Sequence, residues 1–338
     1  MQVLYTDRHL SHQPAEFITA GRLAPIPECS ERVDRFLSSI AAGRHDIEAP
    51  DNYGMVPIAR IHDAGYLDFL ATVHDRWRQL SGASDTVLPN VHPSRHGAGR
   101  PEHVVGQAGY YMADTACPIT AGTWDAARAA ADVAVATADS VLAGAPVAYG
   151  LCRPPGHHAM ADLAGGFCFL NNVAIAAGHC RDRGTSRVAI LDVDVHHGNG
   201  TQQIFYGRDD VLFVSLHGDP AGFYPYYSGY ADERGDGAGL GFTLNLPLPP
   251  GTGDDGFLQA LGGALDNIRA FDPGILLVSL GLDAQENDPL GILKVTTAGF
   301  GAVARQIAGL ALPTILIQEG GYLCDELGAN LAAFLAEF

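Results

Sequence analysis

The 338-residue chain has 20 basic and 38 acidic residues, and this formal net charge of -18 disfavours nucleic-acid partners, which bind positive surfaces. The sequence has neither an apolar run long enough to span a bilayer nor a basic segment followed by a short apolar core at its N-terminus. We therefore expect a cytoplasmic protein without membrane contact. The six cysteines lack Cys-x-x-Cys spacing, which argues against a zinc ribbon and a disulfide scaffold.

Apolar, β-prone segments alternate along the chain with stretches of helical periodicity. The predicted strands cover residues 2–5, 147–152, 188–193, 211–215, 241–246, 274–280 and 313–318. The clearest predicted helices cover residues 65–80, 124–142, 171–181, 256–270, 297–310 and 324–336. This alternation indicates right-handed crossovers and a mostly parallel sheet with helices on both faces. Because no linker-like or repeated segment divides the chain, we expect residues 1–338 to form a single α/β domain.

Residues 89–102 form a polar segment that is rich in Gly and Pro and lacks helical or strand periodicity. Long loops of this kind in compact enzymes are usually lids, binding loops or interfaces. We expect this segment to lie at the entrance of a site or at a subunit interface.

The segment 190–200 ends a β-prone run in metal-ligand types on alternating positions. Because successive side chains of a strand point to opposite faces, Asp192, Asp194 and His196 project to the same side. Two carboxylates and an imidazole suit a divalent cation such as zinc, and would also accept Fe2+ or Co2+. The alternative is an ordinary buried strand whose acidic end caps the next helix. The Gly-Asn-Gly turn at 198–200 favours the metal site, because it lets backbone and side chains converge on one point.

Two histidines follow a predicted strand and a Pro-Pro-Gly turn within residues 151–159. In isolation, His157 and His158 would be interpreted as a metal-chelating tract or as a buried pair. Beside a metal site they become candidate general acids and bases.

Two further apolar runs, 276–283 and 315–322, end in glycine next to a polar residue. This pattern is typical of buried parallel strands whose carboxyl ends open into a ligand crevice. Asp283 would complete a three-ligand site that keeps an open position for water. Tyr322 would present its phenol to whatever the metal binds, with ordinary packing as the alternative role.

These motifs, in this order and spacing, resemble the histone deacetylase and acetylpolyamine amidohydrolase superfamily over essentially the whole chain. The matching segments are residues 153–158, 165–172, 192–200, 215–217, 279–283 and 319–322. The nearest likeness is to bacterial acetylpolyamine amidohydrolases and class II-type deacetylases, through residues 106–111, 122–124 and 151–158. The resemblance implies the arginase/deacetylase fold, a doubly wound sheet with the site in loops at its carboxyl edge.

The resemblance implies a zinc-dependent deacetylase that cleaves the linear C–N amide bond of a small N-acylated amine with metal-activated water. The zinc ligands of the family correspond to Asp194, His196 and Asp283. Its catalytic residues correspond to His157, His158, Tyr322, Asp192 and Asn199.

The two histidines differ in the partners that the resemblance implies for them. His157 is paired with Asp192, and His158 with Asn199. A carboxylate partner favours the imidazolium, whereas an amide leaves the ring nearer neutrality. We therefore predict that His158 is the general base and acid and that His157 acts mainly through its charge and hydrogen bonds. Tyr322 is predicted to donate its hydroxyl to the oxyanion that forms during hydrolysis.

The resemblance also implies bound potassium with a structural role. The first potassium site corresponds to Asp192, Asp194, His196, Ser215 and Leu216. A second site corresponds to the carbonyl groups of Phe205, Arg208, Val211 and Phe242, where side-chain identity carries little information.

The narrow substrate tunnel of the family corresponds to the aromatic pair Phe167 and Tyr224, flanked by Gly166 and Gly320. Two facing rings hold an alkyl chain well, and a cationic chain more strongly. Packing in the core is the alternative role for both rings.

The positions that select the substrate depart from the family pattern. Two acids of the polyamine-cleaving enzymes fall at Val105 and Ala116 in this chain, so that Glu102 or Asp114 would have to replace them. The expected substrate is an acetylpolyamine or an acetyl-lysine-like amine, and a small neutral amide is the alternative.

In the polyamine branch the insertion that matches residues 89–102 packs across a dimer, so we expect a homodimer. Two other classes of function remain open. An arginase-like ureohydrolase with two manganese ions would need a further carboxylate near Asp283, where this chain has Gln285. An inactive binding module is disfavoured, because the ligand and catalytic residues are retained together.

Overall fold

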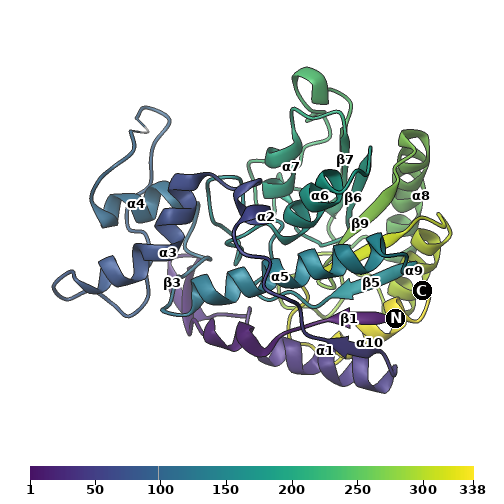
Figure 1. The fold of residues 1–338 in the computed structure, drawn as a ribbon, viewed down its shortest axis with the longest axis horizontal. Helices are drawn as coiled ribbons and strands as arrows, with labels where there is room; N and C mark the ends of the chain where they lie inside the picture. Colours follow the sequence, from purple (N-terminus) through teal and green to yellow (C-terminus); the bar gives the residue numbers. More distant parts are fainter. Residues whose placement is uncertain (98) are drawn as a thin grey trace.

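An eight-stranded sheet forms the centre of the computed structural model, which describes residues 1–97 and 99–338. The strand order is β4-β1-β5-β10-β9-β6-β7-β8, and every neighbouring pair runs parallel (Figure 1). The strands are β1 (Gln2–Leu4), β4 (Asp46–Glu48), β5 (Val147–Gly150), β6 (Val188–Asp192), β7 (Val211–Gly218), β8 (Thr243–Leu248), β9 (Ile275–Leu280) and β10 (Thr314–Gln318).

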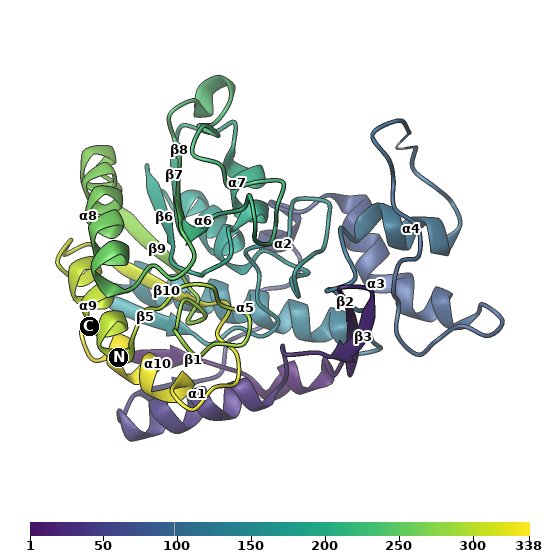
Figure 2. The same cartoon turned by 180° about the vertical axis from the view of Figure 1, so that it is seen from behind.

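Helices cover both faces of this sheet. They are α1 (Glu31–Ala42), α2 (Val56–Ala59), α3 (Ala64–Arg78), α4 (Val104–Tyr111), α5 (Thr123–Leu142), α6 (Asn172–Asp182), α7 (Asn199–Phe205), α8 (Asp254–Phe271), α9 (Thr297–Ala308) and α10 (Leu327–Leu335). One face packs against α1, α8, α9 and α10, and the other against α5 and α6 (Figures 1 and 2). Because strand side chains alternate, Leu276 and Val278 of β9 enter the first core while Ile275 and Leu277 enter the second.

The helices α3 and α4 lie outside these layers and form the projection on the left of Figure 1. They share a hydrophobic core with part of α5. The antiparallel hairpin of β2 (Glu16–Thr19) and β3 (Arg22–Pro25) lies near the base of this projection (Figure 2). The predicted entrance or dimer loop, residues 89–102, belongs to the same projection, and its residue 98 lies outside the described residues.

Both chain ends lie on the side of the molecule opposite this projection (Figure 1). The amino group of Met1, just before β1, lies 3.3 Å from Nδ1 of His45. Phe338 lines a surface hollow together with Pro146 and Pro313, the residues that precede β5 and β10. The two termini therefore lie at the amino edge of the sheet.

The prediction of an α/β fold with helices on both faces of a mostly parallel sheet is confirmed, and the sheet is entirely parallel. All seven predicted strands and the six named helices are present, with ends that differ by a few residues. The sequence did not indicate β4, because all three of its residues are exposed and give no hydrophobic pattern. That the chain is one domain stays a prediction.

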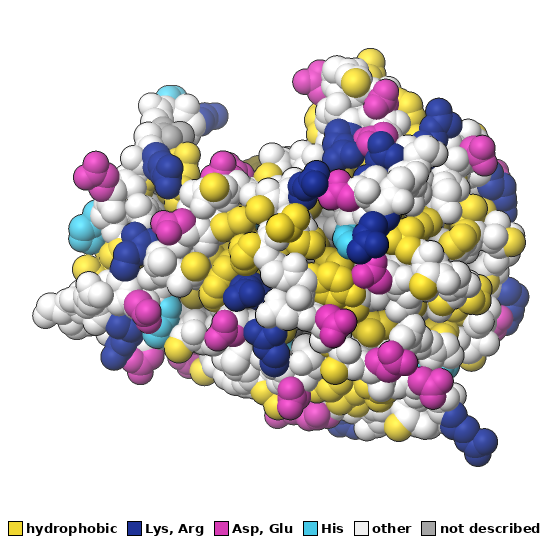
Figure 3. Space-filling model, viewed as in Figure 1, with side chains coloured by type: hydrophobic (Ala, Val, Ile, Leu, Met, Phe, Trp, Pro, Cys, Tyr) yellow, Lys and Arg dark blue, Asp and Glu magenta, His cyan; other side chains and the backbone are white. Residues whose placement is uncertain are grey.

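No helix within the described ranges is long and apolar enough to cross a membrane. On the face in Figure 3, basic side chains are scattered among acidic ones and do not gather into one positive surface. That nucleic acids are not partners stays a prediction.

Truncating a core leucine of β9 should destabilise the fold strongly. Leu277 is fully buried, so we expect Leu277→Ala to lower the free energy of unfolding by about 2–5 kcal/mol. Leu240→Ala is the matched control, because 67% of the Leu240 side chain is exposed. Denaturant unfolding of both variants checks the difference, and equal midpoints would contradict the assigned core.

Candidate active site

Three side chains converge at the carboxyl edge of the sheet, where two neighbouring strands end. Asp194 and His196 follow β6, and Asp283 follows β9. One ligand atom of each residue lies within 4.8 Å of the others, and all three residues are buried. Nδ1 of His196 is 3.1 Å from Oδ1 of Asp194 and 3.2 Å from Oδ2 of Asp283. The structure therefore brings together the ligand set that the family resemblance implied, and Asp192 is not part of it.

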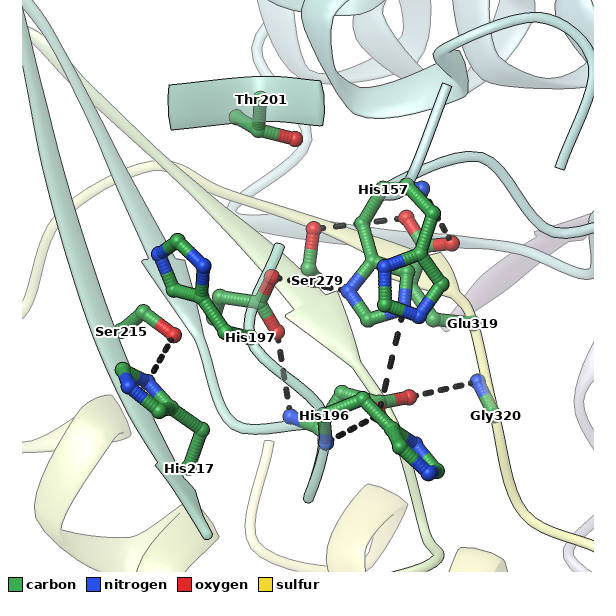
Figure 4. Close-up of polar contacts among 12 residues, drawn as sticks. His157, His196, His197, Thr201, Ser215, His217, Ser279, Glu319 and Gly320 are labelled. Atoms are coloured by element: carbon green, nitrogen blue, oxygen red, sulfur yellow. Dashed lines mark hydrogen bonds and ion pairs between the residues drawn. The ribbon is translucent and has the colours of Figure 1, made fainter. Parts of the chain in front are cut away.

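The donor set fits a divalent cation. Burial and the neighbouring Asp194 carboxylate raise the pKa of Asp283, because two carboxylates that face each other away from water repel. A bound cation would relieve this repulsion. Space for it depends on Gly320, where a Cβ atom would collide with the carboxylate oxygens of both aspartates. The backbone N–H of Gly320 also donates to Oδ2 of Asp194 at 2.8 Å (Figure 4).

The two adjacent histidines lie beside this cluster with their rings 4.0 Å apart, measured between centroids. Nδ1 of His157 is 3.0 Å from Oδ2 of Asp192, and Nδ1 of His158 is 2.7 Å from Oδ1 of Asn199. Burial opposes the charge on His157, but the carboxylates of Asp194 and Asp192 outweigh it and raise its pKa to about 10. Burial, followed by the charges of His157 and His196, lowers the pKa of His158 well below its usual value. These opposite pKa shifts favour the imidazolium form of His157 and the neutral form of His158.

A buried carboxylate that the sequence interpretation left without a role holds the histidine loop in place. Oε2 of Glu319 accepts the backbone N–H groups of Gly156 at 2.6 Å and His157 at 3.1 Å. Its Oε1 accepts the hydroxyl of Ser279 at 3.3 Å (Figure 4). Burial raises the pKa of Glu319 to about 7. The sequence showed only that Glu319 directly precedes the Gly-Gly turn. It did not show which groups the carboxylate would bind.

A cavity of about 540 Å³ opens onto His158 and His196. Its wall includes residues of the β2–β3 hairpin and several aromatic side chains, among them Phe167, Tyr224 and Tyr322. Tyr322 is buried, and its backbone N–H donates to Oδ2 of Asp288 at 2.7 Å. The guanidinium of Arg32 lies 4.8 Å from the centroid of the Tyr322 ring. The aromatic pair predicted to line a tunnel, Phe167 and Tyr224, therefore lines a cavity that reaches the metal-ligand cluster at His196.

Only some of the residues predicted to line the tunnel or to select the substrate lie in the cavity wall. Gly166, Phe167, Tyr224 and Ala116 line the cavity, whereas Gly320 lies against the ligand carboxylates. Among the described residues, Val105 and Glu102 are not in the cavity wall; Val105 packs against the core of the projection and Glu102 is exposed. Whether these two positions affect specificity stays a prediction.

Of the first predicted potassium site, Asp192, Ser215 and Leu216 lie in the neighbouring strands β6 and β7, whereas Asp194 and His196 follow β6. Asp192 of β6 is paired in register with Ser215 of β7, and both are fully buried. The Ser215 hydroxyl lies 2.8 Å from Nδ1 of His217 (Figure 4). Leu216 follows in the same strand and is also buried.

At the second predicted potassium site, two of the carbonyl groups already accept backbone hydrogen bonds. The N–H of Arg208 donates to Phe205 at 3.0 Å, and the N–H of Phe213 donates to Phe242 at 2.9 Å. The Arg208 side chain is paired with Asp210 at 2.7 Å. Potassium at either place stays a prediction.

An arginase-like site would need a further carboxylate at position 285. This chain has Gln285 there, and its side-chain amide already forms a hydrogen bond. Gln285 is buried, and its Oε1 accepts the backbone N–H of Asn287 at 2.5 Å. The geometry therefore favours a single metal between Asp194, His196 and Asp283.

Comparison with known proteins identifies relatives over the whole chain. The family described as "Histone deacetylase domain" matches residues 26–338. An acetylpolyamine amidohydrolase of Burkholderia pseudomallei is 45% identical over 97% of this chain and 95% of that protein. Acetylpolyamine amidohydrolase 1 of Pseudomonas aeruginosa is 45% identical over 98% of this chain and 96% of that protein.

Solved structures agree with this assignment of relatives. The crystal structure of acetylpolyamine aminohydrolase from Burkholderia pseudomallei superposes with a TM-score of 0.96 at 44% identity and covers 100% of this chain and 98% of that chain. The HDA15 HD domain superposes with a TM-score of 0.82 at 29% identity, over 99% of this chain and 90% of that chain.

Filling the space beside the two aspartates should prevent metal binding. We expect Gly320→Ala to reduce the divalent metal retained after dialysis at least tenfold, because its Cβ would displace both carboxylates. Gly263→Ala in α8 is the control, since a Cβ there meets nothing within 4 Å. Elemental analysis gives the metal content, and circular dichroism confirms that both variants fold. Full metal retention by Gly320→Ala would contradict the assigned centre.

Proposed function

Because this chain belongs to the histone deacetylase family, we propose that it is a zinc-dependent amidohydrolase that deacetylates small N-acetylated amines, with acetylpolyamines as the substrate class. The single observation that carries the proposal is the buried cluster of Asp194, His196 and Asp283 at a cavity that His158 also lines. The names of the relatives at 45% identity support the acetylpolyamine part. A small neutral amide is the alternative substrate.

Asp194, His196 and Asp283 would hold the zinc ion. Zinc would act as a Lewis acid that polarises the amide carbonyl and lowers the pKa of water bound to it towards ~7. The same two carboxylates and imidazole would also accept Fe2+ or Co2+.

The two histidines would divide the work of proton transfer. His158 is the ring whose lowered pKa keeps it neutral, so it can take the proton of the attacking water and later give it to the departing amine. His157 stays an imidazolium at neutral pH because of its two aspartates, and its charge would stabilise negative charge that develops nearby. This division agrees with the partners Asn199 and Asp192.

Tyr322 would donate its hydroxyl to the oxyanion of the substrate. Burial raises its pKa well above the usual value, so the phenol keeps its proton throughout the working range of pH. The hydrogen bond from its backbone N–H to Asp288 fixes the loop that carries it. A donor that is already oriented need not be reorganised when the charge develops.

Potassium, a dimer and a cytoplasmic location belong to the same proposal. Potassium would occupy the buried site of Asp192, Asp194, His196, Ser215 and Leu216 and would have a structural role. The loop 89–102 would contribute to a homodimer, and sedimentation at working concentration tests this. The substrate would be a small molecule, with neither nucleic acids nor membranes as partners.

Removal and return of zinc tests the proposed function directly. Protein stripped with a chelator should release no acetate from N-acetylputrescine, and zinc should restore the release. Asp283→Asn should stay inactive at the same zinc concentration, because a ligand is lost. Asp266→Asn is the control and should behave like the unaltered protein, because Asp266 is an exposed residue of α8. Acetate release that is independent of metal would refute the proposal.

Removing the Tyr322 hydroxyl should reduce turnover while zinc remains bound. Loss of one oxyanion donor costs about 2.7–4 kcal/mol, so we expect Tyr322→Phe to lower kcat about 100- to 1000-fold. Tyr227→Phe serves as the matched control, because 93% of that side chain is exposed. Steady-state kinetics with parallel zinc analysis measures both. A Tyr322→Phe enzyme with unaltered kcat would rule out the assigned role.

A further inference from the structure

We infer that Asp114 both anchors the distal ammonium group of a cationic substrate and holds two walls of the cavity together. The inference rests on the proposed amidohydrolase function and assigns to one residue of this chain a role in selecting the substrate. Asp114 lies in the segment between α4 and α5, outside the metal-ligand cluster.

The charge content of the cavity supports the first role. Among the described residues that line it, Asp114 is the only Asp, Glu, Lys or Arg. The other ionisable groups of the wall are His158, His196 and tyrosines. Ala116 is also in the wall but is apolar, and Glu102 is not part of it. A substrate that occupies the cavity would therefore meet one acidic side chain and no basic one from lysine or arginine.

Neutral donors surround the Asp114 carboxylate and leave its charge without a counterion. Its Oδ1 accepts the backbone N–H of Ala116 at 2.8 Å. Its Oδ2 accepts the hydroxyl of Tyr224 at 2.7 Å and the backbone N–H of Gly166 at 3.2 Å. Asp114 takes part in none of the ion pairs within the described residues. Three donors therefore bind this carboxylate, and one of them, the Gly166 N–H, is shared with Oδ1 at 3.4 Å. A carboxylate offers about four acceptor sites, so one further donor such as an ammonium can bind.

The same hydrogen bonds join two segments that are far apart in the sequence. Tyr224 belongs to one wall, and Gly166 precedes Phe167 in another. Both Gly166 and Phe167 have positive φ, of 51° and 69°, and this conformation is uncommon for a residue with a side chain such as Phe167. In addition to the bond from the Gly166 N–H to Asp114, the N–H of Phe167 donates to the carbonyl of Ala116 at 3.1 Å. The segment around Asp114 thus fixes the strained turn and the tyrosine relative to each other.

These contacts specify the chemical class of the ligand. An alkyl chain between Phe167 and Tyr224 would carry its amide towards His158 and its free end towards Asp114. A protonated amine at that end would gain a charge-assisted hydrogen bond, and the aromatic faces would add a cation–π attraction. A methyl group in its place would leave the carboxylate facing an apolar atom. An acetylated diamine fits this arrangement better than a neutral alkyl amide.

The test compares N-acetylputrescine with N-pentylacetamide, which replaces the ammonium by a methyl group. Zinc-loaded unaltered protein should prefer the cationic amide about 10- to 100-fold in kcat/KM. Asp114→Asn keeps the shape but removes the charge, so we expect it to abolish this preference mainly through the KM of N-acetylputrescine. Asp266→Asn is the matched control, because it removes an exposed acid of α8 outside the cavity, and it should keep the preference.

A second variant separates charge from structure. Asp114→Asn combined with Ala116→Asp returns a carboxylate to the cavity wall without rebuilding the original bonds, and it should recover most of the preference. If Asp114→Asn lost activity equally on both amides, and the double variant did not recover the preference, Asp114 would have only a structural role. That result would overturn the ammonium site. An unaltered enzyme that cleaves both amides equally would also overturn it. Cleavage of neither amide would instead count against the proposed function.

Discussion

Buried carboxylates that accept backbone N–H groups organise the whole site. Away from water such a carboxylate needs donors, and here main-chain groups of neighbouring loops supply them. Asp194 binds the N–H of Gly320, Asp283 binds that of Val195, and Glu319 binds the turn before His158. Each acid on one strand end therefore fixes a loop that follows another strand. This cross-linking places ligands, histidines and tyrosine together although His157 and Tyr322 are 165 residues apart in the chain.

The parallel sheet makes this arrangement possible, because all its strands present their carboxyl ends at one edge. The groups that we propose to perform the chemistry follow those strand ends, and two hydrophobic cores support the strands. The cavity wall has a different origin: it includes the β2–β3 hairpin and the segment around Asp114. The chemical centre and the recognition surface are consequently built from separate parts of the fold.

Much of the centre could be predicted from local sequence patterns. The buried strand β6 carries a continuous apolar signal, but it ends at Asp192, so Asp194 and His196 lie in the bend that follows it and not on alternating strand positions. The hairpin and the bonds of Asp114 could not be predicted in the same way. β2 has mostly exposed residues without clear alternation, and Asp114 meets Tyr224 only through a contact between residues 110 positions apart. Glu319 was visible as part of a motif, but its partners were not.

The position of the chain ends has a practical consequence for handling the protein. Met1 and Phe338 both lie at the amino edge of the sheet, whereas the cavity opens at the carboxyl edge. An affinity tag or a surface linker attached at either end would leave from the side opposite the substrate opening. The enzyme could therefore be immobilised on a resin or an electrode through a terminus with its opening turned towards the solution, and a fused reporter domain would not obstruct diffusion into it.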